Sequence, residues 1–66
     1  NPAQSNIQID GHINGEPYTI TDLSGKVIIR ENIQSEQIDL NSLSDGIFLL
    51  RLFDSNQVIR ISKNSF

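Results

Sequence analysis

The chain has 66 residues, a net charge of -3 and no cysteine. A chain this short supports a single domain with one small core, and the absence of cysteine excludes disulfides and thiolate metal sites. The acidic balance gives no indication of a cationic surface, so no nucleic-acid partner is expected, and no apolar run approaches the roughly 20 residues of a membrane-spanning helix.

The first residues indicate a connection followed by strands. Residues 1–6 are polar and contain a proline, so we expect them to be the end of a linker or the lead-in to the first strand. Short apolar alternations then recur about every ten residues between turn residues, which predicts a sandwich or barrel of strands. The first alternation covers residues 7–9 and ends at Asp10 and Gly11.

A hairpin is predicted in the first half of the chain. Pro17 precedes a strand pattern at residues 18–21, and a proline is tolerated where a strand begins. Asp22 suits the opening of the following turn and Gly25 suits its left-handed corner. The turn leads into a second strand pattern at residues 26–30, which completes the hairpin.

The second half of the chain contains three further strand patterns. Residues 36–40 alternate polar and apolar side chains, which places Ile38 and Leu40 toward the core. Residues 47–53 are apolar on both faces, so we expect a central strand with a neighbour on each side. A short loop then leads to the last strand, residues 57–63. No segment holds the spacing of an amphipathic helix, and we expect six strands and no helix.

Side chains suited to catalysis or metal binding are few. His12 is the only histidine and lies in a turn between strands, where an exposed side chain without a role is expected. Most Asp residues stand at strand ends, where Asp caps turns, and no EF-hand spacing appears, although a calcium site in a cluster of loop Asp residues stays open. We therefore expect no enzymatic activity, no cofactor and no metal ligands.

The aromatic residues are more easily explained by packing than by ligand binding. Tyr18, Phe48 and Phe53 lie in predicted strands, where they would fill the core. If Tyr18 or Phe66 formed a solvent-facing platform instead, the chain would be an accessory Ig-like or fibronectin-like module that binds carbohydrate or spaces domains. That module is the alternative function.

Several short motifs resemble one protein family when they are taken in order. The chain opens with Asn-Pro, continues with a D-x-x-G-K turn at residues 22–26 and an L-x-x-L-x-x-G-I-F stretch at residues 40–48, and closes with the basic pair Arg60 and Lys63. Over essentially its whole length it resembles the type A C-terminal sorting domain of type IX secretion cargo in Bacteroidetes.

The resemblance implies a fold, a function and partners. The fold would be all-β, a small immunoglobulin-like antiparallel β-sandwich of about six to seven short strands, forming a single C-terminal sorting domain over residues 1–66. Its function would be to direct an upstream cargo domain through the periplasm and across the outer membrane by the type IX translocon, to the cell surface or the medium. A sortase-like cysteine peptidase would then cleave off the domain during surface attachment.

Five residues match motif positions of the family and are the candidate contacts of the secretion machinery: Gly25, Gly46, Phe48, Arg60 and Lys63. Packing alone also accounts for several of them, because positive φ costs glycine little and a phenylalanine fills a core. Recognition would use strand addition at the exposed edge of the final strand, and the same edge leaves an edge-strand dimer open.

Three departures from the family pattern concern these contacts. Ser44 and Asp45 stand where a turn with proline is common, Arg60 stands where lysine is usual, and residues 64–66 extend past the basic pair. An arginine presents a planar fork and a lysine a point charge, so the departures bear on the detail of receptor contact and leave the strand plan intact.

Overall fold

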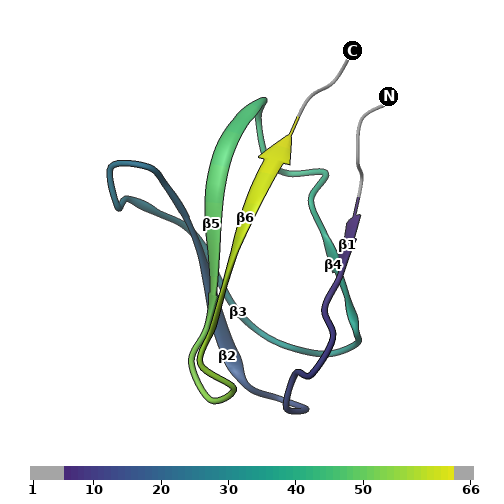
Figure 1. The fold of residues 1–66 in the computed structure, drawn as a ribbon. Coiled ribbons are helices and arrows are strands. Elements are labelled where there is room, and N and C mark those ends of the chain that lie inside the picture. Colours follow the sequence, from purple (N-terminus) through teal and green to yellow (C-terminus); the bar gives the residue numbers. More distant parts are fainter. Residues whose placement is uncertain (1–5, 64–66) are drawn as a thin grey trace.

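The computed structural model describes residues 6–63, which form six strands in two antiparallel sheets, and the described part of the chain contains no helix (Figure 1). The all-β prediction is therefore confirmed. The smaller sheet pairs β1 with β4, and the larger sheet has the order β3-β2-β5-β6. The strands are β1 (Asn6–Gln8), β2 (Pro17–Asp22), β3 (Val27–Asn32), β4 (Gln37–Asp39), β5 (Gly46–Leu52) and β6 (Gln57–Lys63).

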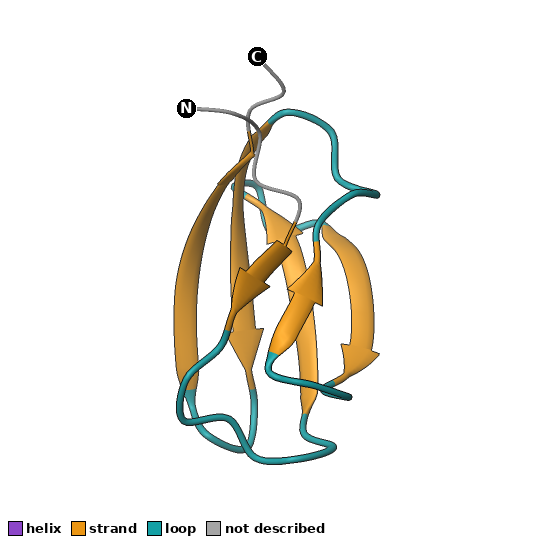
Figure 2. Ribbon diagram, turned by 90° about the vertical axis from the view of Figure 1, so that its right-hand side faces the viewer, coloured by secondary structure: helices purple, strands orange, loops and turns teal. Residues whose placement is uncertain are grey.

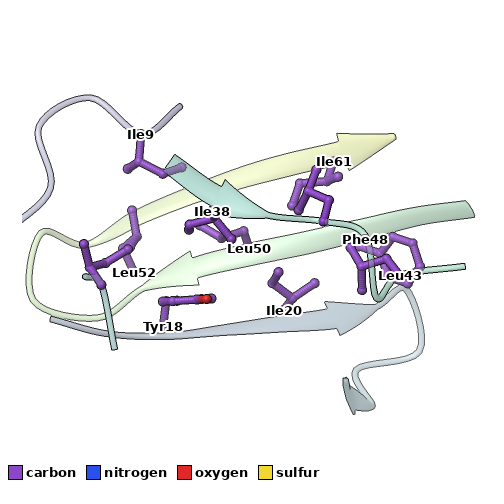
Figure 3. Close-up of a cluster of buried hydrophobic side chains, with 11 residues drawn as sticks. Ile9, Tyr18, Ile20, Ile38, Leu43, Phe48, Leu50, Leu52 and Ile61 are labelled. Atoms are coloured by element: carbon purple, nitrogen blue, oxygen red, sulfur yellow. The ribbon is translucent and has the colours of Figure 1, made fainter. Parts of the chain in front are cut away.

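The two sheets form a small sandwich, with the β1 and β4 pair lying over one face of the four-stranded sheet (Figure 2). Apolar side chains from both layers fill the space between them and form one buried cluster (Figure 3). The buried members are Ile9, Tyr18, Ile20, Ile33, Ile38, Leu40, Leu43, Phe48, Leu50, Leu52 and Ile61. A single core of this kind is what a chain of this length can support.

β5 is a central strand of the larger sheet, with a neighbour on each side, as its apolar sequence predicts. It pairs with β2 on one side and with β6 on the other, both antiparallel. Phe48, Leu50 and Leu52 alternate into the core, whereas Leu49 is half-buried and Arg51 is exposed on the opposite face. The period of two along β5 therefore separates a core face from an outer face.

The turn of the β2 and β3 hairpin is organised by Asp22. Its Oδ1 atom accepts hydrogen bonds from the Ser24 hydroxyl at 2.7 Å and from the backbone N–H groups of Ser24 and Lys26, each at 3.0 Å. The Ser24 hydroxyl and the Lys26 N–H stabilise the ionised form and lower the pKa of the Asp22 carboxyl. Gly25 then takes a φ of 95°, the left-handed corner that its sequence position predicts.

Two expectations about single side chains are wrong. Phe53 follows β5 instead of belonging to it and is 47% exposed. Side chains alternate between the two faces, and Phe53 comes directly after the core residue Leu52, so it lies on the outer face. His12 is half-buried instead of exposed, and its Nδ1 atom lies 3.2 Å from the carbonyl oxygen of Ile9. The predicted lead-in also ends one residue earlier, because Asn6 begins β1; residues 1–5 and Phe66 lie outside the described residues.

Candidate functional site

The five candidate contact residues do not form a single site. Gly25 is exposed in the β2 and β3 turn, at the tip of that hairpin. Gly46 and Phe48 lie together at the start of β5, where a Cβ atom on Gly46 would be 3.7 Å from the Phe48 ring, and Phe48 is buried. Arg60 and Lys63 are both in β6, but their odd separation places Arg60 outward and Lys63 inward.

Lys63 is buried because its ammonium group binds backbone carbonyls. Only 8% of the residue is exposed, and Nζ donates to the carbonyl oxygens of Leu40 at 3.1 Å and Leu43 at 3.0 Å. These two carbonyls belong to the turn that follows β4. The side chain therefore ties the end of β6 in the larger sheet to the chain that leaves the smaller sheet.

Replacing Lys63 by methionine is expected to destabilise the fold by about 1–3 kcal/mol, because two buried carbonyls lose their donor while the apolar stem is retained. Urea unfolding followed by circular dichroism measures the change. Lys26→Met is the matched control: Lys26 is exposed in a turn, and its substitution should change stability by less than about 0.5 kcal/mol. Equal losses in the two variants would show that the Lys63 ammonium group contributes nothing specific.

Glu16 is a buried carboxylate that no local sequence pattern indicated. It is 1% exposed, and its Oε2 atom accepts a 2.6 Å hydrogen bond from the N–H of Ile13. Its Oε1 atom accepts from the N–H of Asp54 at 3.1 Å and from the N–H and hydroxyl of Ser55 at 2.8 and 3.0 Å. The carboxylate therefore joins the turn before β2 to the loop between β5 and β6.

The hydrogen bonds of Glu16 decide its charge state. Burial raises the pKa of the Glu16 carboxyl, but the donors from Ile13, Ser55 and Asp54 together outweigh burial and hold the pKa below its ordinary value of 4.5. Two of these donors are 38 and 39 residues away along the chain. No local pattern could have identified the contact, because the partners meet only when the sandwich has formed.

One side of β6 has no strand partner among residues 6–63. β6 pairs with β5 along its whole length, from Gln57 opposite Leu52 to Lys63 opposite Gly46, and β5 is its only neighbour in that part of the chain. At its start, the Gln57 side chain donates to the carbonyl oxygens of Asp10 and Gly11. β6 is thus fixed at both ends, by Gln57 and by Lys63, while Arg60 lies exposed between them.

The described residues offer little that resembles a catalytic or metal centre. Within residues 6–63, no group of three or more His, Asp or Glu side chains could hold a metal ion. A hollow of about 180 Å³ lies beside β3 and β4, lined by Tyr18, residues 31–35 and residues 37–39. No helix in the described part of the chain is long and apolar enough to cross a bilayer.

Comparison with known proteins identifies the family. Neither the curated proteins nor the solved structures contain a significant match. A family model described as "Secretion system C-terminal sorting domain" matches residues 1–64. Because the match spans nearly the whole chain, including all six strands, the chain belongs to this family of sorting domains, which are C-terminal signals for type IX secretion cargo that is exported to the cell surface or extracellular space.

Proposed function

We propose that the secretion machinery recognises the folded sandwich through β6, with Arg60 as the principal side-chain contact. The observation that carries the proposal is the state of β6: it is held at both ends, by Gln57 and Lys63, and has one side without a strand partner among the described residues. A strand fixed in this way presents its backbone groups without a large loss of conformational entropy on binding.

Strand addition is the mechanism in this proposal. A segment of the outer-membrane translocon pairs with the free side of β6, so that backbone hydrogen bonds supply affinity and side chains supply specificity. Arg60 supports this role because it is exposed midway between the two fixed ends of the strand. The same free edge could pair with a second copy of the chain, and that dimer is the competing use of β6.

The other four candidate residues have more indirect roles in the proposal. Gly25 shapes the turn that closes the β2 and β3 hairpin, while Gly46, Phe48 and Lys63 keep β5 and β6 in place. The domain itself carries out no chemistry; a sortase-like cysteine peptidase of the machinery removes it and attaches the cargo to the surface. Removal as a unit is supported by the self-contained core of the sandwich.

The carbohydrate-binding alternative has lost one of its two supporting residues. Tyr18 is buried at 8% exposure and packs in the core, so it forms no platform for a sugar ring. The other residue, Phe66, lies outside the described residues.

Export of a fusion protein tests the proposal. Residues 1–66 are fused to a periplasmic reporter in a bacterium with a type IX system, and the reporter is measured in medium, cell surface and periplasm. We expect export of the unmodified fusion, no export after deletion of residues 57–66, and about tenfold less export with Arg60→Gln, the size of effect expected for an interface arginine.

Lys26→Gln is the matched control for the lost charge, because Lys26 is exposed in the turn at the far end of the β2 and β3 hairpin. Its export should equal that of the unmodified fusion. Retention of the unmodified fusion in the periplasm would reject the proposal, and equal export by the two single variants would remove Arg60 from it. Size-exclusion chromatography of the purified fusion separates the edge-strand dimer from the monomer.

A further inference from the structure

The outer face of the four-stranded sheet, meaning the side turned away from β1 and β4, carries all three arginines of the chain. Arg30 in β3 pairs with Thr19 in β2, and Thr19 pairs with Arg51 in β5. Two residues before Arg51 in β5, Leu49 pairs with Arg60 in β6. Arg30, Arg51 and Arg60 are exposed and alternate along their strands with residues that face the core.

No carboxylate occupies an outward position of this sheet. Only two of the eight acidic residues lie in its strands, and both pair with core residues: Glu31 lies opposite Tyr18 and Asp22 lies opposite Phe48. The remaining six are outside the four strands. A chain with a net charge of -3 thus has a cationic outer face, because the fold separates its charges.

Two of the arginines, Arg30 and Arg51, line a shallow apolar groove of about 320 Å³. Its lining includes Leu49, Val58 and Phe53, of which Val58 is 64% exposed and Phe53 47% exposed. The guanidinium carbon of Arg51 lies 5.1 Å from the centre of the Phe53 ring, so a cation–π contact orients this arginine at the groove. Exposed apolar side chains gathered beside oriented charges are typical of interaction surfaces.

The spacing of the charges follows from the strand registers. Arg30 and Arg51 are separated by two strand spacings, about 10 Å, with Thr19 between them. Arg51 and Arg60 are diagonal neighbours on adjacent strands, roughly 7–8 Å apart. A ligand that meets all three must therefore carry several negative charges spread over three strand spacings, about 15 Å, and an apolar group between them.

We infer that this outer face binds an acidic and apolar polypeptide segment of the secretion machinery. This inference rests on the proposed sorting function and adds Arg30, Arg51 and Phe53 to its binding surface. The carboxylates of the segment pair with the arginines, and an apolar side chain enters the groove between Leu49 and Val58. Arginine suits this role because its planar fork binds a carboxylate through two hydrogen bonds.

The composition of the face favours a protein over a phosphate-rich polymer or lipid. Its exposed cations are arginines, and an aromatic residue, Phe53, lies beside one of them. Arginines and aromatic residues are both enriched at the centre of protein interfaces. Arg30 and Arg51 are the two cations that line the groove, and the rest of its lining is uncharged. A hydrophilic polyanion binds more tightly the more of its phosphates are neutralised, so it would find few partners there. The groove therefore selects for a partner with apolar side chains.

Site-specific crosslinking of the reporter fusion tests the inference. The photoreactive residue benzoylphenylalanine replaces Phe53, or replaces Leu23 in the exposed β2 and β3 turn as an off-face control, and crosslinks are formed in whole cells. We expect an adduct from position 53 and not from position 23, joined to a peptide that contains Asp or Glu next to apolar residues. Arg30→Gln with Arg51→Gln should lower its yield about tenfold, whereas Lys26→Gln should not.

A charge exchange provides the sharpest check. Replacing the carboxylates of the crosslinked peptide by lysine should abolish the adduct, and Arg51→Glu in the fusion should restore it. Urea unfolding of each fusion variant confirms that the outer-face substitutions leave the sandwich folded. An adduct with a glycolipid, an adduct between two fusion molecules, or a yield that does not depend on the arginines would each overturn the inference.

The outcome is separable from that of the sorting function, because crosslinks are read in cells whether or not the reporter leaves the periplasm. Export of the unmodified fusion without an arginine-dependent crosslink would overturn the outer-face inference and leave the proposed function standing. An arginine-dependent crosslink in a fusion that stays in the periplasm would support the binding surface and reject the proposed function.

Discussion

Leu50→Ala is expected to remove most of the stability of the domain. Leu50 is fully buried in the central strand, where it packs among side chains of both layers. Truncating a buried leucine typically costs about 2–5 kcal/mol, since apolar contacts are lost and a cavity remains. A core of this size supplies only about 3–5 kcal/mol in total, so the variant should be largely unfolded at ambient temperature or melt roughly 10–30 °C lower.

The neighbouring residue provides a matched control. Leu49→Ala makes the same chemical change one position away, but Leu49 is half-buried on the outer face and lacks the enclosed surroundings of Leu50. It should cost less than about 1 kcal/mol in thermal or urea unfolding. Similar losses at the two positions would contradict the assignment of core and outer faces in β5.

Glu16→Gln is expected to lower the stability of the fold substantially. The amide has nearly the same shape as the carboxylate, but it loses the charge and directs an N–H group toward donors from Ile13 or from Asp54 and Ser55. Buried groups that lose their partners are destabilising, and we expect a fall in Tm on the order of 10 °C. Glu36→Gln, on an exposed side chain, should change Tm little.

The same carboxylate makes stability depend on pH. The folded pKa of Glu16 is below the ordinary value of 4.5, so the folded state holds the ionised form more tightly than the unfolded chain does. Its contribution is fully present above that value and is lost as the pH falls through the folded pKa. Urea midpoints measured between about pH 7 and pH 3 should therefore fall more steeply for the wild type than for Glu16→Gln. Parallel curves would contradict this role.

The strand plan could be predicted because it is local. Alternating side chains marked the segment around Ile38, the doubly apolar segment around Leu50 became the central strand, and Asp22 with Gly25 defined a hairpin turn. Each of these features depends on neighbours within a few residues. The order β3-β2-β5-β6 depends on which strands bury their side chains against each other, and no local pattern determines it.

The features that the sequence did not reveal depend on contacts between distant segments. Glu16 precedes a proline and looks like part of a polar turn, yet its donors include Asp54 and Ser55. The different surroundings of Arg60 and Lys63, by contrast, could have been recognised from their odd separation in one strand. Net charge was also a poor guide to the surface, because it averages the outer face with the acidic remainder of the chain.

The position of β5 and β6 in the chain has a consequence for when the domain can fold. Ribosomes synthesise proteins from the amino end, and a chain that stops before residue 46 has β2 and β3 but lacks both strands that complete the larger sheet. It also lacks Leu50 and Ile61 of the core and the Lys63 contact that joins the layers. We therefore expect truncated cargo to carry no folded domain, so that a transport apparatus which recognises the fold exports only products whose translation has run to completion.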